Sequence, residues 1–267
     1  MKKTSLLRSE QNRERLLGFV CGVLSICIFL AFWEWGARYT HLSRFLSGPS
    51  EVIPAFVKSF TEPIGVKTMG THIITSVTRV MTGFVIASAV GIVIGIAMGT
   101  SRIMRALFKP LIELIRPIPG IAWIPISILW FGTGEVSKVF IIAVSTFSLV
   151  AINAMAGATA VDPGLIGAAK MLGASNAQVF FTVILPASVP QIFAGLQTAL
   201  SICWMIVLAA EMVRSEFGVG WIITAGSNAG NMTQVMVGII AIGIIGLILA
   251  NLLRWIEARL CAWKESK

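Results

Sequence analysis

Long apolar segments, each able to cross a lipid bilayer, dominate this sequence and limit what it can fold into. A helix needs about 20 apolar residues to cross the hydrocarbon core. The chain of 267 residues is 56% hydrophobic and 12% charged, against about 25% charged residues in a soluble domain. We therefore expect an all-α membrane protein, with a cytoplasmic segment over 1–15 and a single transmembrane domain over 16–267. The six expected spans are 16–35, 80–98, 111–131, 139–158, 189–210 and 235–253.

The basic residues indicate how these spans are oriented. Six spans place both termini on one side, and cytoplasmic loops carry an excess of Lys and Arg. With the termini inside, the inner segments hold thirteen basic residues and the outer segments hold six. Both termini and the loop 159–186 are therefore predicted to be cytoplasmic. Because the basic residues lie between apolar runs, the net charge of +9 indicates membrane orientation and not binding to nucleic acid.

Small residues form a ridge along the second span. They recur at every fourth position, at Gly83, Ala87, Gly91, Gly95 and Gly99. Such a ridge lets two helices approach closely within lipid. We favour packing inside one subunit over a dedicated dimer face.

The third apolar segment is broken by prolines and carries two ionisable residues. The prolines at 110, 117, 119 and 125 exclude one regular helix, and broken backbone at membrane depth is tolerated where it lines a cavity or is buried in protein. Glu113 and Arg116 are three positions apart, so they can pair. Ionisable groups within a membrane indicate function by default. The alternative is that the pair only anchors the helix at the cytoplasmic interface.

Cysteine and histidine usage gives no sign of a metal site or a disulfide. The four cysteines form no C-x-x-C pair, and the two histidines are far apart, without a carboxylate cluster. We expect buried cysteines that act as small hydrophobic side chains, and no bound metal. The residues concerned are Cys21, Cys27, Cys203, Cys261, His41 and His72.

The loop 159–186 has the punctuation of two short helices. Asp162 can cap a helix that Pro163 opens. Gly173 suits the left-handed position that ends a helix, and Ser175 or Asn176 can cap the next one. Pro186 marks a further boundary. The loop is predicted to contact another molecule; the alternative is a hairpin that only links two spans.

The spacing in this loop resembles a signature of the permease subunits of ABC importers, E-A-A-x3-G-x9-I-x-L-P. The matching residues are Ala168, Ala169, Gly173, Val183, Leu185 and Pro186. Further shared elements, at 116–119, 129–134, 137–138 and 209–211, resemble the nitrate, sulfonate, taurine and bicarbonate branch. Two positions depart from the signature, because Gly167 stands in place of Glu and Val183 in place of Ile.

The resemblance implies the six-span fold of type I importer permeases, in a bacterial inner membrane, with a cytoplasmic coupling helix over about 163–172. Two permease subunits, a homodimer in our prediction, would work with two separate ATPase subunits and a periplasmic or lipid-anchored binding protein. This chain would bind no cofactor and hydrolyse no ATP, because it has no G-x-x-x-x-G-K-[ST] loop. The expected ATPase-coupling residues are Pro163, Leu165, Ile166, Gly167, Ala168, Ala169, Leu172, Gly173, Leu185 and Pro186. The pathway or gating candidates are Glu113, Arg116, Pro117, Pro119 and Glu211.

A secondary transporter is the main alternative from another class. It would need ionisable residues near the bilayer centre, and only Glu113 and Arg116 could serve there. A membrane enzyme would need a nucleophile or metal cluster, which the sequence does not show. The segments 232–238 and 259–263 resemble the sulfonate and taurine type more than the nitrate type. A small anionic solute, with taurine or an aliphatic sulfonate favoured, is therefore the expected cargo.

Overall fold

The computed structural model describes residues 2–41 and 46–260, which form helices and turns without a β-strand. The all-α prediction is confirmed. In chain order the helices are α1 (Lys2–Tyr39), α2 (Pro49–Lys58), α3 (Met69–Thr100), α4 (Arg102–Ile115), the 3-10 turn η2 (Gly120–Trp123), α5 (Ile124–Phe131), α6 (Glu135–Thr159), α7 (Pro163–Met171), α8 (Asn176–Val179), the π-helical turn η3 (Phe180–Ile184), α9 (Leu185–Arg214), α10 (Val219–Asn228) and α11 (Met232–Leu260).

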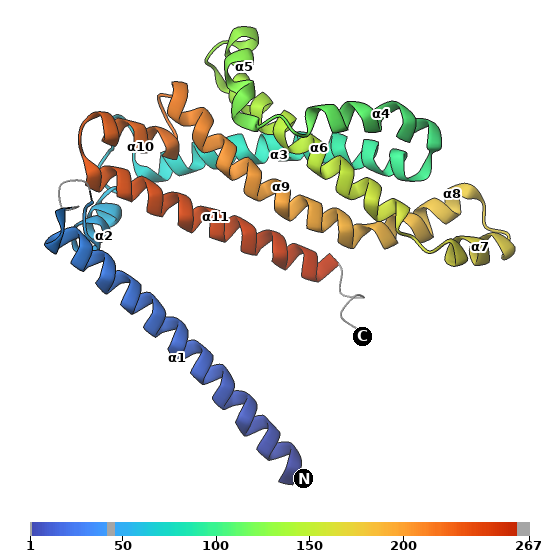
Figure 1. The fold of residues 1–267 in the computed structure, drawn as a ribbon, viewed down its shortest axis with the longest axis horizontal. Helices are drawn as coiled ribbons and strands as arrows, with labels where there is room; N and C mark the ends of the chain where they lie inside the picture. Colours follow the sequence, from blue (N-terminus) through green and yellow to red (C-terminus); the bar gives the residue numbers. More distant parts are fainter. Residues whose placement is uncertain (1, 42–45, 261–267) are drawn as a thin grey trace.

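The long helices form a bundle with two distinct ends. α3, α6, α9 and α11 run along the long axis, with α7 and α8 at one end and α2 and α10 at the other (Figure 1). α1 leans away from this bundle and meets it near α2. Five described helices are long and apolar enough to cross a membrane, or six elements when one bent pair counts as a span. The predicted number of six spans is therefore reached when this bent pair counts as one span.

The bent pair is the proline-rich third segment. α4 and the following 120–131 segment meet at 91°, with Pro117 and Pro119 at the bend, where proline removes backbone donors. The prediction that this segment is not one helix is confirmed. The helix α4 begins at Arg102, before residue 111, where the predicted span starts. Arg105 lies on α4 and donates to the carbonyl oxygens of Met98 and Gly99 at 3.0 Å, so it caps the end of α3.

The sequence also missed two features of the polar stretches. The segment 211–233 contains the helix α10, which begins after Gly218 in a positive-φ conformation. Pro186 does not end a helix, because the chain stays helical from α8 through η3 into α9. The π-helical turn lies immediately before Leu185 and Pro186, and the Leu185 amide donates to the Phe180 carbonyl oxygen. The helical hydrogen-bond register therefore changes next to the proline, which has no backbone N–H to donate.

The small-residue ridge of α3 packs against α6 within this one chain, as favoured from the sequence. An added Cβ at Gly95 would lie 2.4 Å from the Ala151 carbonyl oxygen. One at Gly99 would lie 2.4 Å from the Ala158 Cβ. α6 is covered along most of its length and forms the centre of the core.

Replacing Gly95 with alanine is expected to lower the melting temperature of the detergent-solubilised protein, because the added methyl group forces α3 away from α6. Overpacking of this kind costs about 1–3 kcal/mol. Gly243 of α11 is the matched control, since no atom lies within 4 Å of its added Cβ. Alanine there should stabilise by about 0.5–1 kcal/mol through helix propensity. Equal melting temperatures for the two variants would contradict the packing argument.

Candidate functional site

The helix α7 is built by local signals at both of its ends. Asp162 accepts a hydrogen bond from the Gly164 amide at 2.8 Å, and Pro163 occupies the first helical position. At the other end Gly173 has φ +84° and donates to the Lys170 carbonyl oxygen at 3.0 Å. The next amide, of Ala174, reaches back to the Ala169 carbonyl oxygen at 3.0 Å. These two bonds form a Schellman motif, which satisfies the last carbonyls of the helix.

A capping box starts the second helix of the loop. The Gln178 amide donates to the Ser175 hydroxyl at 3.3 Å, and the Ser175 amide donates to the Gln178 side-chain oxygen at 2.8 Å. Of the two caps considered from the sequence, Ser175 is the one used. The loop therefore places α7 as a rigid, separately capped helix at one end of the bundle (Figure 1).

The outer surface of α7 is apolar. No residue of this helix is fully buried, and Leu172 and Met171 are 89% and 86% exposed. Leu165 is also exposed. Ile166, by contrast, lines a 560 Å³ cavity beneath the helix. Met171 was not singled out from the sequence, although its exposure is among the highest in the described chain.

Gly167 leaves an open position on this surface. No atom lies within 4 Å of a Cβ added there, and its backbone is helical. The fold therefore does not require glycine at this position. Contact through α7 would depend on shape and apolar side chains rather than on the signature carboxylate.

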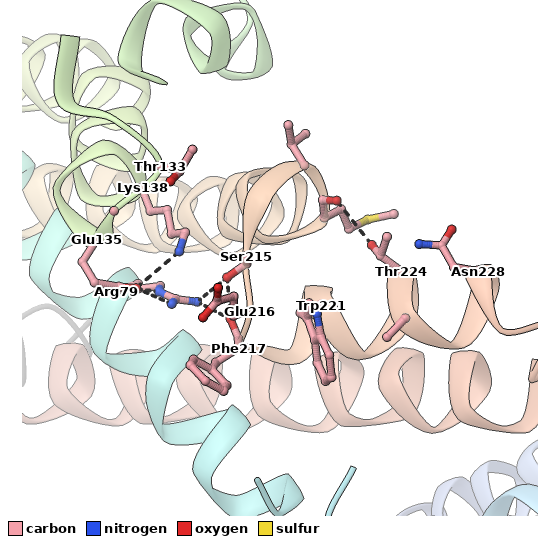
Figure 2. A pocket seen from close by; sticks show the side chains of 14 residues that line it. Arg79, Thr133, Glu135, Lys138, Ser215, Glu216, Phe217, Trp221, Thr224 and Asn228 are labelled. Carbon is pink, nitrogen blue, oxygen red and sulfur yellow. Dashed lines mark hydrogen bonds and ion pairs between the residues drawn. The ribbon is translucent and has the colours of Figure 1, made fainter. Parts of the chain in front are cut away.

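An ion-pair network centred on the buried side chains of Arg79 and Glu211 lies at the opposite end of the bundle (Figure 2). Arg79 of α3 donates to both carboxylate oxygens of Glu135 at 2.5 Å and to Glu211 at 2.7 Å. It also donates to the Phe217 carbonyl oxygen at 2.7 Å. The Arg79 and Glu211 side chains are 3% and 0% exposed, respectively. Ser76 donates to Glu211 at 2.8 Å, so each charged group has several partners.

This network ties four elements together. Arg79 comes from α3, Glu135 from the start of α6 and Glu211 from the last turn of α9, while α10 contributes the Gly220 amide, 2.9 Å from Glu211. Gly218 permits the close turn, since an added Cβ would lie 2.3 Å from the Glu211 side-chain carboxyl carbon. Glu211 was selected from the sequence, but Arg79 was missed because it lies just outside the predicted second span. A lone arginine within an apolar helix was the available signal.

A 670 Å³ cavity adjoins the network and opens beside it (Figure 2). Lys138 projects toward Glu135 at 3.3 Å and is only 8% exposed. Arg79, Lys138, Glu135 and Glu211 together carry no net charge. The remaining lining groups are Thr133, Gly134, Met212, Val213, Ser215, Glu216, Phe217, Trp221, Thr224, Ala225 and Asn228.

The structure does not bring the other pathway candidates into this network. Glu113 and Arg116 are exposed on and just after α4. The prediction that they pair is wrong, because Glu113 instead pairs with Lys109 at 3.5 Å. Arg116 is still in helical conformation, and its amide donates to the Ile112 carbonyl oxygen at 2.9 Å, so Glu113 is engaged by Lys109 although the spacing to Arg116 is helical. Pro117 and Pro119 are exposed in the bend.

Comparison with known proteins decides the family. Residues 87–261 match the family described as binding-protein-dependent transport system inner membrane component. The chain belongs to this family. It is 36% identical to the taurine transport system permease protein TauC of Escherichia coli over 90% of this chain and 88% of that protein. It is 30% identical to the nitrate import permease protein NrtB of Synechococcus elongatus, over 91% and 90% of the two chains.

A relative from an archaeon is more similar still. The chain is 39% identical to a putative ABC transporter permease protein of Methanocaldococcus jannaschii, over 88% of this chain and 89% of that one. The fold resembles the MetNI methionine ABC transporter in inward-facing conformations, with a TM-score of 0.57, 18% identity and coverage of 80% and 99%. The chain is thus an ABC importer permease, as the loop signature indicated, and belongs to the taurine, nitrate and sulfonate branch, as the segments 116–119, 129–134, 137–138 and 209–211 indicated.

Proposed function

We propose that this chain carries a small anionic solute across the membrane, with taurine or an aliphatic sulfonate favoured. The observation that carries the proposal is its 36% identity to the taurine permease over 90% of this chain. The sulfonate-type segments at 232–238 and 259–263 support the same solute class. Nitrate is the alternative that the 30% identity to the nitrate permease favours, and bicarbonate belongs to the same branch.

We propose that the energy for transport comes from ATP hydrolysis by separate ATPase subunits that dock on α7. The apolar surface of Leu165, Met171 and Leu172 supports this role, because exposed apolar side chains mark protein contacts. The Schellman turn at Gly173 fixes the end of that surface. The coupling set is the one predicted from the sequence, Pro163, Leu165, Ile166, Gly167, Ala168, Ala169, Leu172, Gly173, Leu185 and Pro186, with Met171 added.

The proposed assembly sits in a bacterial inner membrane. α7 and both termini face the cytoplasm, and the Arg79–Glu211 network lies near the outer surface. Two copies of this chain form the pathway, two ATPases bind below, and an extracytoplasmic binding protein delivers the solute above. Glu211 acts here as a positioning residue for the outer ends of α3, α6, α9 and α10, because its carboxylate contacts only groups of the network.

Reconstitution tests this proposal. The chain would be co-expressed with a partner ATPase subunit, placed in liposomes and supplied with a substrate-binding protein. We expect ATP hydrolysis to rise when taurine or ethanesulfonate is present, and not with nitrate or bicarbonate. Stimulation of ATP hydrolysis by nitrate alone would show that nitrate, and not taurine or a sulfonate, is the transported solute. Solute uptake without the ATPase, driven by an ion gradient, would contradict the proposal of an ATP-driven importer and favour a secondary transporter.

A further inference from the structure

His72 is buried in the first turn of α3 and contacts the amino end of α10. Its side chain is 0% exposed. The Gly218 amide donates to His72 Nδ1 at 3.1 Å, and His72 Nε2 lies 3.2 Å from the Ile64 carbonyl oxygen. An amide N–H can only donate and a carbonyl oxygen can only accept, so Nδ1 carries no proton and Nε2 carries one. These two bonds therefore select a neutral ring in one tautomer.

The amino end of α10 is held by three side chains in a row. The amides of residues 218, 219 and 220 donate to His72, Ser76 and Glu211, at 3.1, 2.9 and 2.9 Å respectively. The first amides of a helix have no partner inside the helix. Two acceptors from α3 and one from α9 satisfy them here, so His72 helps to fix where α10 begins.

Two aromatic rings beside His72 connect it to the ion-pair network and its cavity. The Trp221 ring stacks on the imidazole, with centroids 5.3 Å apart and planes within 6°. The Phe217 ring lies 6.4 Å away. Both rings line the 670 Å³ cavity (Figure 2), and the Phe217 carbonyl oxygen accepts from Arg79 at 2.7 Å. A movement of the turn 215–218 would therefore alter both the network and the cavity wall.

The surroundings of His72 oppose a positive charge on its ring. The Lys67 ammonium lies 3.6 Å from the centroid of the neighbouring Phe217 ring. The helix α10 contributes no titratable side chain, and its amino end carries a partial positive charge. Arg79, also positive, lies two turns further along α3. A second proton on His72 would point an N–H at the Gly218 N–H, so that bond would be lost.

No carboxylate among the described side chains forms an ion pair with His72 to balance such a charge. The Glu211 carboxylate accepts instead from Arg79, Ser76 and the Gly220 amide. Glu62, in the turn before α3, and Glu216, in the turn before α10, are exposed. A charged ring would thus be buried and uncompensated, which is costly. The proton is accepted more readily when the turn 215–218 has moved away.

We propose that His72 is an acid-sensitive latch at the outer end of the bundle. The neutral ring holds the turn before α10 against α3, and protonation from the outer side releases that turn and slows solute transport. His72 is a positioning residue, because it acts through the Glu211 network and the cavity wall. The outer location and the effect on transport rest on the proposed function, whereas the latch itself rests on the bonds of the ring.

The tautomer of His72 can be observed directly. The chain has two histidines, so His41→Asn leaves His72 as the only one when the purification tag contains none. In protein labelled with ¹⁵N-histidine, the ring nitrogen signals distinguish the two neutral tautomers and the charged ring. We expect the Nε2–H tautomer at about pH 7.5, above the ordinary titration range of histidine. A charged ring or the Nδ1–H tautomer at that pH would overturn the proposal.

Thermal unfolding measures the proton that the latch excludes. An unfolded histidine binds a proton below about pH 6.5, and the latched ring does not, so stability should fall as the pH drops. Between about pH 6.5 and 5, the melting temperature of the wild type should fall more steeply than that of His72→Asn, by the equivalent of one proton. Asparagine can still accept from the Gly218 amide but does not titrate. His41→Asn, at an exposed position, is the matched control and should keep the wild-type slope. Equal slopes for the wild type and His72→Asn would refute the latch.

Uptake into liposomes connects the latch to transport. ATP and an inner buffer of about pH 7.5 are enclosed, the binding protein is added outside, and the outer pH is lowered to about 5.5, below the titration range of free histidine. Uptake by the wild type should fall at least threefold more than uptake by His72→Asn, and the ratio cancels any effect of pH on the partner proteins. An equal fall in both would overturn the proposed acid effect. Absence of uptake at every pH would contradict the proposed function instead, and the latch would still stand or fall by the tautomer and the unfolding slopes.

Discussion

Replacing Arg79 with methionine is expected to destabilise the protein strongly, because Glu211 would be left charged and buried without its main partner. Removing one member of a buried ion pair costs about 3–5 kcal/mol. Glu211 is held between α3, α9 and α10 by Ser76, Arg79 and the Gly220 amide. The effect should appear as a lower melting temperature and a smaller monodisperse fraction after extraction in detergent.

A second substitution separates the loss of a partner from the loss of arginine itself. Combining Arg79→Met with Glu211→Gln removes the unpaired charge, so this double variant should be more stable than Arg79→Met alone. Lys109→Met is the matched control for removing a cation, because its pair with Glu113 is exposed at 47% and 58%. Exposed pairs contribute little. A double variant no better than the single one would show that the network is not held together by charge.

This network marks the limit of what the sequence could predict. Glu211 was accessible through the shared A-A-E element, but Arg79 meets Glu135 and Glu211 from 56 and 132 residues away. No local pattern gives such pairings, since they arise only when α3, α6 and α9 pack. The pairing of Glu113 failed for a different reason. A second cation, Lys109, lies four positions before it on the same helix and pairs with its carboxylate at 3.5 Å.

The loop around α7 was predictable because its signals act between near neighbours. Asp162 caps an amide two residues away, Ser175 and Gln178 cap each other, and Gly173 closes the helix with bonds to Lys170 and Ala169. The ridge of α3 was also predictable, as a period of four fixes which residues share a face. Its partner helix was not predictable.

Replacing Gly173 with valine is expected to uncouple ATP hydrolysis from transport while leaving membrane insertion intact. Gly173 has φ +84°, a conformation that costs a β-branched residue about 1–3 kcal/mol. Relief of that strain would break the Schellman bonds and shift Leu172, which is 89% exposed at the end of the proposed docking surface. In reconstituted liposomes, solute-stimulated uptake should fall at least tenfold, while the complex with the ATPase still assembles and hydrolyses ATP.

Asparagine at the same position distinguishes backbone conformation from side-chain bulk. No atom lies within 4 Å of a Cβ added to Gly173, so the Cβ of either variant fits without a contact. Asparagine adopts the left-handed conformation more readily than valine does, so Gly173→Asn should retain most of the uptake. If both variants transport normally, the turn is not needed for coupling. If both fail equally, the position contacts the ATPase directly, and the helix end acts through its surface rather than through its backbone.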